Sequence, residues 1–313
     1  MQTEPLPLTT KQREFVQSRL EREHGDAELW VFPDLLRETR RTQIHQDSGL
    51  NWLEVFRRGI RLMQHQVSDE ECESLLELRF VSWELRERGL ARRLAFNTPS
   101  DLRTALSIEA RVQWFDRGEF GSKNGGCYPE AWDILRALAA KDLAVARRFF
   151  EVNDQPLKRG HRPTVLLYNG LLAVMTDDKK LQSELIGPMA KLKAGEAYKS
   201  MLNVLGGIIN NDASAVAAGL EKVMASFRRL DVLEEDKIIC FQAHGLAELA
   251  LEKNPDLLAE FDCEQELPWD APFFGWLRDK SPNPTYPELA KTFPLLDKWL
   301  NRLEPPAWWE KGD

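Results

Sequence analysis

Apolar residues in this chain recur mainly at steps of three and four positions, which places them on one face of an α-helix. The clearest stripe runs through Val216, Leu220, Val223 and Phe227. Strict alternation of apolar and polar residues over the length of a strand is nearly absent. The pattern therefore predicts an all-α fold with little sheet.

Capping residues mark where helices should begin and end. Thr9 and Gln12 have the spacing of a capping box, in which each side chain accepts a hydrogen bond from the backbone N–H of the other residue. The pair Asn254-Pro255 predicts the end of a helix that runs from about Glu234. Both signals agree with the helical spacing of the neighbouring apolar residues.

A weak repeat occurs in the middle of the chain. Asp142, Asp177 and Asp212 are spaced 35 residues apart, and each stands between two apolar helical runs. An aspartate there can cap the second helix of a hairpin, and a period of about 34 to 40 residues is typical of stacked helical hairpins. We therefore expect a helical bundle with solenoid-like stacked helix pairs in the middle and C-terminal parts. An irregular helical bundle is the alternative, since three aspartates can align by chance.

Composition divides the chain into two regions. A glycine-rich stretch, residues 118–128, separates an arginine-rich N-terminal helical region, residues 1–120, from a helical-hairpin region, residues 121–313. From Pro268 onward the chain is rich in proline and tryptophan, and this tail should wrap over the helices before a last helix near 286–303. We expect the two regions to form one continuous structural unit.

Negative charge is concentrated in one segment. Residues 231–270 hold twelve carboxylates and two lysines, a local charge of −10, whereas the whole chain of 313 residues carries −8. Such a cluster focuses the electrostatic field and steers an oppositely charged partner. The acidic balance also argues against direct nucleic-acid binding, which needs lysine and arginine to neutralise phosphates.

Two groups of residues in this segment are candidates for contact with a basic protein. In the first group, carboxylates such as Glu234 and Glu235 stand at the start of an expected helix. Negative charge there stabilises the helix dipole, and this structural role is the alternative explanation for them. In the second, carboxylates and aromatic residues share a connection between helices, where charges would set register and aromatic side chains would supply binding energy. A solvated loop whose aromatic residues pack into the core is the alternative. The candidate partner-binding residues are Asp231, Glu234, Glu235, Glu260, Asp262, Glu264, Glu266, Trp269 and Asp270.

The one glycine motif that suggests a cofactor is incomplete. Gly121 and Gly126 have the glycine spacing of a phosphate-binding loop. That loop needs Lys and then Ser or Thr directly afterwards, and Cys127 and Tyr128 occupy those positions. No β-strand pattern precedes the glycines, so we interpret the stretch as a loop between two helices.

Cys240 and His244 lie one helical turn apart, and a thiolate–imidazole pair can act as nucleophile and base or bind a metal. The surrounding residues are small or apolar, which favours core packing, with Gly245 and Ala247 letting a neighbouring helix approach closely. No further metal ligand is spaced nearby. We therefore expect no enzymatic activity, no metal and no cofactor. An all-helical enzyme that uses Cys240 and His244 is kept as a further hypothesis.

The sequence favours a cytoplasmic location and no contact with a membrane. No apolar run is long enough to span a bilayer, and the first residues lack the basic and apolar pattern of a secretory signal. The four cysteines lie far apart and form no C-x-x-C pair. This spacing argues against a disulfide framework and against a structural zinc site.

The stretch from Asp236 to Ala250, followed by the acidic connection and the Leu-Pro-Trp-Asp run at 267–270, resembles the helical immunity proteins of bacterial polymorphic-toxin systems, most nearly immunity family forty-nine. The resemblance covers roughly the last 180 residues. It implies a non-enzymatic cytoplasmic protein that binds one cognate toxin domain and blocks its active site or its access to substrate. In such systems the toxin is often a nuclease delivered by contact-dependent or type VI secretion. No contact residue carries over from the family.

Two functions therefore stand beside the enzyme hypothesis. The resemblance and the acidic segment favour an immunity protein whose acidic surface covers a basic surface of the toxin. The 35-residue spacing favours a helical-repeat adaptor or regulator, which would bind a peptide or protein partner in a concave groove. The partner of an adaptor need be neither basic nor toxic.

Overall fold

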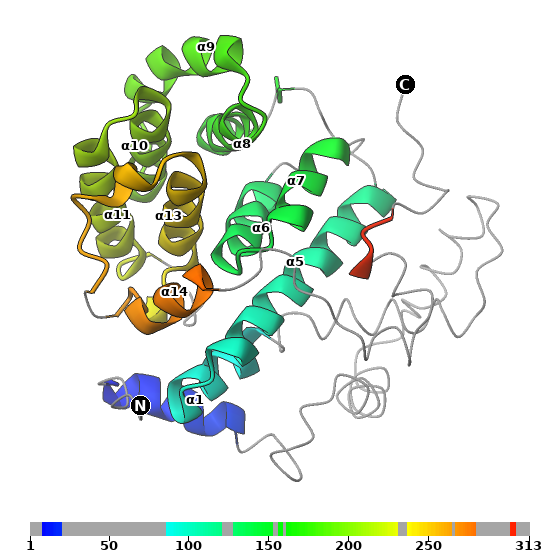
Figure 1. Ribbon diagram of the computed structural model, residues 1–313, viewed down its shortest axis with the longest axis vertical. Coiled ribbons are helices and arrows are strands. Elements are labelled where there is room, and N and C mark those ends of the chain that lie inside the picture. The colour runs from blue at the N-terminus through cyan, green and yellow to red at the C-terminus, as the bar shows by residue number, and fades with distance from the viewer. Residues whose placement is uncertain are drawn as a thin grey trace, which may run out of the picture. The chain divides into compact units, whose positions relative to one another are not determined.

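The computed structural model describes residues 8–20, 86–120, 128–152, 156–158, 161–230, 237–264, 267–279 and 301–304. Across these ranges the chain forms helices and turns and no β-strand, so the predicted all-α fold is confirmed (Figure 1). The chain divides into two compact units, one formed by Met1–Gly121 with Pro284–Asp313 and the other by Ser122–Asn283. The division falls in the glycine-rich stretch.

The first unit contains α1 (Thr10–Leu20), a helical stretch at 86–96 and α5 (Pro99–Phe120). The capping box before α1 is confirmed. Thr9 N–H donates to Gln12 Oε1 at 2.8 Å, and Gln12 N–H donates to Thr9 Oγ1 at 3.3 Å. Each bond satisfies an N–H group that the start of a helix leaves without a backbone acceptor.

Charged side chains lie in the interior of the first unit. Arg86 pairs with Glu109, and both side chains are almost fully buried. A second pair, between Arg92 Nε and Asp101 Oδ2 at 2.8 Å, is partly exposed. Because a buried charge is tolerated only when it is paired, the arginine-rich N-terminal region uses part of its charge internally.

The second unit begins with three helical hairpins. Contacts run in series from α6 (Tyr128–Ala139) to α8 (Arg162–Met175) and from α8 to α10 (Glu196–Asn210), so the helix pairs stack as predicted for this part of the chain (Figure 1). The predicted apolar stripe of α11 (Ala213–Phe227) is buried along its whole length. The hairpins are α6 (Tyr128–Ala139) with α7 (Leu143–Val152), α8 (Arg162–Met175) with α9 (Lys179–Ala190), and α10 (Glu196–Asn210) with α11 (Ala213–Phe227).

The same turn joins the two helices of each hairpin. A residue in the left-handed conformation ends the first helix, and the N–H of the residue after it donates to the carbonyl five residues earlier at 2.8 to 3.0 Å. This hydrogen-bond pattern is the Schellman motif, which satisfies carbonyls at a helix end. The left-handed residues are Lys141 (φ 52°), Asp177 (φ 57°) and Asn211 (φ 54°).

An aspartate then starts the second helix of each hairpin. Its Oδ1 accepts a hydrogen bond from the N–H three residues later, at 3.0 to 3.4 Å. The prediction of capping aspartates is confirmed for Asp142 and Asp212. It is wrong by one residue at Asp177, because Asp178 caps α9 and Asp177 holds the left-handed position.

Helix α13 (Phe241–Lys253) is the centre of the second unit. It packs against α6, α10 and α11, and its ten consecutive residues from Phe241 to Ala250 are all buried. A helix that packs on one side only would expose every third or fourth residue. The first and third hairpins, together with η2 and the aromatic residues near Trp269, therefore leave no open face along residues 241–250.

The helix expected from Glu234 to Lys253 is not continuous. The chain leaves the helical conformation at Ile239 and Cys240. At this break Cys240 N–H donates to Pro268 O at 2.9 Å, so a tertiary hydrogen bond replaces a helical one. The predicted end of the helix at Asn254 is confirmed. The last helix expected near 286–303 lies almost entirely outside the described residues.

Two short helices follow α13, namely the 3₁₀ helix η2 (Pro255–Leu258) and α14 (Ala271–Arg278). Lys141, in the turn of the first hairpin, reaches the C-terminal end of α14. Its Nζ donates to Leu277 O at 3.2 Å and to Arg278 O at 3.5 Å. A cation at this position complements the helix dipole and ties the first hairpin to the last helix of the unit.

A glycine sets the distance between α13 and α6. A Cβ atom added to Gly245 would lie 2.2 Å from the carbonyl oxygen of Leu135, which is far closer than any van der Waals contact. The obstacle is backbone, so no side chain can move aside. The predicted close approach at Gly245 is therefore confirmed.

Replacing Gly245 with alanine should lower the free energy of unfolding by about 2 kcal/mol or more, because α13 and α6 must move apart. Gly206, in the interior of α10, is the matched control, since nothing lies within 4 Å of an added Cβ there. Gly206→Ala should raise stability by about 0.5–1 kcal/mol through the helix propensity of alanine. Equilibrium denaturant unfolding of both variants measures the difference, and equal effects would contradict the close contact.

Candidate functional site

Three residues of the second candidate group, Glu260, Asp262 and Glu264, lie on the loop that follows η2. We refer to residues 259–264 as the acidic loop. Glu260, Asp262 and Glu264 are exposed there, and Asp256 is exposed in η2 just before it. Four carboxylates within nine residues thus point to solvent on one short segment of the second unit.

Buried residues hold the backbone of the acidic loop. Phe261, in its middle, is only 5% exposed and packs edge-on against the Trp269 ring at a centroid distance of 4.9 Å. Trp269 Nε1–H donates to the Cys263 carbonyl at 2.9 Å. Asp262 Oδ1 accepts from Glu264 N–H at 3.0 Å, which forms a local turn. The loop therefore presents its carboxylates from a fixed backbone.

The expectation that Trp269 and Asp270 contact a partner is wrong, because neither residue exposes any surface. The Trp269 ring stacks on His244 at a centroid distance of 4.0 Å. Asp270 caps α14, where its Oδ1 accepts from Phe273 N–H at 3.0 Å. The alternative in which the aromatic residues pack into the core is the one the structure shows.

A local signal identifies the role of Asp270. It is followed by Ala271 and Pro272, and an aspartate just before a proline in a first helical turn is a common helix start. Sequence reasoning treated this stretch as a wrapping tail and missed the helix. The carboxylate of Asp270 is buried for that reason and is not available at the surface for contact with a partner.

Other members of the acidic segment divide into two sets. Glu248 is buried and lies 3.9 Å from Lys141 Nζ, and Glu252 lies 3.4 Å from Arg147 Nη2. These two carboxylates form ion pairs with cationic side chains of the same unit. The predicted residues Asp231, Glu234, Glu235 and Glu266 lie outside the described residues.

The acidic loop keeps much of its negative charge uncompensated. Within the described part of the chain, no lysine, arginine or histidine nitrogen lies within 4 Å of the carboxylates of Glu260 and Glu264. Burial raises the pKa of the Cys263 thiol, the nearby charge of Arg278 lowers it, and Glu264 and Asp262 raise it further. The thiol therefore lies in an apolar and partly acidic environment.

Cys240 and His244 form part of the core. Both are buried, and His244 Nε2 accepts a hydrogen bond from Asp270 N–H at 3.1 Å. An imidazole nitrogen that accepts a hydrogen bond carries no proton, so it cannot donate to a substrate without losing this contact. The geometry agrees with the core packing expected for this pair. The glycine stretch at 121–127 lies outside the described residues.

None of the helices in the described ranges combines the length and the apolar character needed to cross a bilayer. Comparison of the chain with known protein families, with curated proteins and with solved structures gives no match. Function must therefore be inferred from the chain's own residues and their arrangement.

Replacing Trp269 with phenylalanine should loosen the acidic loop, because the hydrogen bond to the Cys263 carbonyl is lost. We expect amide hydrogen exchange at 262–264 to accelerate about tenfold, as for the loss of one buried hydrogen bond. Trp132→Phe in α6 is the control, since Trp132 packs against Tyr198 and Phe227, away from the loop. Equal exchange in the loop of both variants would show that Trp269 does not hold it.

Cys240 should resist iodoacetamide until the protein unfolds, because the side chain is fully buried. Cys263 should react slowly at neutral pH and faster as the pH rises, since burial raises the pKa of its thiol. Peptide mass spectrometry after timed labelling separates the two sites. Rapid labelling of Cys240 in the folded protein would support the enzyme hypothesis.

Proposed function

We propose that this protein is a non-catalytic inhibitor that acts in the cytoplasm and binds a basic protein, in the manner of an immunity protein that neutralises its cognate toxin. The acidic loop covers a cationic surface of the partner. The main observation in support is the exposure of Glu260, Asp262 and Glu264 on a loop whose backbone is held by buried residues. The sequence resemblance to helical immunity proteins points to the same function.

Fixed charges are suited to this task. A loop that is already ordered loses little conformational entropy on binding, so more of its electrostatic attraction contributes to affinity. Charges of one sign on an exposed segment also accelerate association with a partner of opposite charge. A nuclease toxin fits this description, because an enzyme that binds nucleic acid presents lysine and arginine to the phosphates.

Inhibition follows from competition for the same surface. When carboxylates occupy the cationic groups of the partner, the phosphates of its substrate cannot reach them. No chemical step is needed for this, which agrees with the use of Cys240 and His244 in packing.

A helical-repeat adaptor is the second candidate function, and the three hairpins with identical turns favour it. Adaptors of this kind bind peptides along the concave side of the array. In the described part of the second unit, α13 packs against the first and third hairpins and is itself buried over ten consecutive residues. Its position favours a binding mode through exposed loops over one through an open groove.

Reversing charge on the acidic loop tests the proposed function. The double variant Glu260→Lys with Glu264→Lys should slow association with the toxin domain encoded beside the gene by about tenfold at low ionic strength. The effect should shrink at high salt, because screening removes long-range attraction. Stopped-flow or biosensor association rates at two salt concentrations measure it, together with protection of cells that express the toxin.

Glu184→Lys with Glu221→Lys is the matched control, since it makes the same charge change at exposed positions on α9 and α11. The control should retain protection and slow association less than the loop variant at both salt concentrations. At high salt it should associate within about twofold of wild type, because screening weakens the effect of distant charges. If both double variants behave alike, the acidic loop is not the binding surface. If the wild-type protein neither binds nor protects, the proposed function is wrong.

A further inference from the structure

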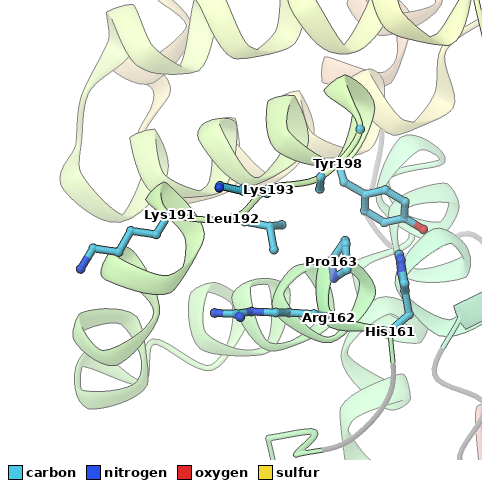
Figure 2. A pocket seen from close by; sticks show the side chains of 9 residues that line it. His161, Arg162, Pro163, Lys191, Leu192, Lys193 and Tyr198 are labelled. Atoms are coloured by element: carbon cyan, nitrogen blue, oxygen red, sulfur yellow. The ribbon is translucent and has the colours of Figure 1, made fainter.

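A pocket of about 510 Å³ opens on the second unit, away from the residues used above. Three segments line it: the start of α8, the connection at 191–195 between α9 and α10, and Tyr198 in the first turn of α10. Figure 2 shows Arg162 and Pro163 along one side and Lys191, Leu192 and Lys193 along another, with His161 and Tyr198 together at one end.

The pocket lining is cationic. Arg162, Lys191 and Lys193 contribute three positive charges, and none of the nine lining residues is acidic. All three side chains are exposed, and within the described residues no carboxylate lies within 4 Å of their charged groups. Glu196 follows the lining residue Gly195 in sequence but does not line the pocket. The local charge therefore favours an anion, although the chain as a whole is negative.

Two helices begin at the pocket with uncapped backbone groups. The N-caps of α8 and α10 are His161 and Gly195, and neither side chain accepts a capping hydrogen bond from a backbone N–H of the first turn. In contrast, the second helices of their hairpins are capped by aspartate side chains, from Asp178 and Asp212. The free N–H groups of the two first turns add to the attraction exerted by the three cationic side chains. Pro163 supplies no N–H to this set, and Glu196 in the first turn of α10 offsets part of the dipole of that helix.

One end of the pocket is built from side chains that position each other. His161 Nδ1 lies 3.1 Å from Thr164 Oγ1, and Thr164 Oγ1 lies 3.3 Å from the Tyr198 hydroxyl. The His161 and Tyr198 rings meet edge-on at a centroid distance of 5.8 Å. Because Thr164 is fully buried, this arrangement is anchored in the core and offers an aromatic wall beside the cations.

We propose that this pocket binds a small organic phosphate, with the phosphate monoester between the three cationic side chains and the two helix starts. A dianion with several acceptor oxygens matches several donors better than a single carboxylate does. The volume falls in the range of small-molecule sites and exceeds what a bare phosphate needs, and Pro163, Leu192 and the Tyr198 ring supply apolar surface for the organic part. The site is independent of the acidic loop.

Isothermal titration at low ionic strength tests this with inorganic phosphate, with phenyl, glycerol and adenosine monophosphates, and with adenosine as the uncharged control. At least one monoester should bind more tightly than inorganic phosphate, and adenosine should not bind. The double variant Arg162→Gln with Lys193→Gln should weaken monoester binding by about tenfold or more, since each removed charge takes away a charge-assisted hydrogen bond.

Lys180→Gln with Lys222→Gln is the matched control, because it removes two exposed positive charges from α9 and α11 outside the pocket. This control should lose much less affinity for the monoester than the pocket variant, because the removed charges lie outside the pocket and act from a greater distance. The proposal is overturned if no monoester binds more tightly than inorganic phosphate, if adenosine binds equally well, or if the control loses as much affinity as the pocket variant. Circular dichroism checks that both variants stay folded. Arg162→Lys keeps the positive charge and should therefore bind the monoester more tightly than the pocket variant does, although less tightly than wild type.

Discussion

The enclosure of α13 is the constraint on which the second unit depends. Its backbone approaches α6 so closely at Gly245 that no side chain fits between them. Its remaining sides are covered by α10, α11, η2 and the aromatic side chains around Trp269. The polar groups of a fully buried helix must find partners inside the protein. His244 meets this requirement by accepting the N–H of Asp270, which links α13 to the start of α14 and, through the Trp269 ring, to the acidic loop. Core and surface loop are therefore parts of one packing arrangement.

Local chemistry made much of the fold predictable. The capping box at Thr9 and the aspartates before α7 and α11 are short-range signals, in which the bond lies within three residues of the side chain. The predictions were wrong where long-range contacts determine the backbone conformation. The helix expected from Glu234 breaks at Cys240, because that N–H bonds to a carbonyl 28 residues away. Spacing alone could not show which of Asp177 and Asp178 caps α9. The backbone conformation decides it, because Asp177 is left-handed and Asp178 is the residue whose side chain accepts the capping hydrogen bond.

The candidate site was predictable only in part, and the reason is physical. A count of carboxylates locates negative charge along the chain but does not say which groups serve the interior. Glu260 and Glu264 stay exposed, whereas Glu248 pairs with Lys141 and Asp270 caps a helix. The sequence did not predict the cationic pocket. Its three charges come from two segments about thirty residues apart, Arg162 in one and Lys191 with Lys193 in the other, in a chain of negative net charge.

The contact of Lys141 with the end of α14 changes how the hairpin array should respond to damage. In an open solenoid each repeat touches only its neighbours, so a terminal repeat can fray or be deleted with a limited loss. Here the first hairpin contacts both α13 and α14, although these helices come after the third hairpin in sequence. The first hairpin is therefore not a free end of a linear stack. Unfolding of the first or the third hairpin would remove packing contacts from α13 as well as from the neighbouring hairpin. We therefore expect the second unit to unfold cooperatively, in a single transition.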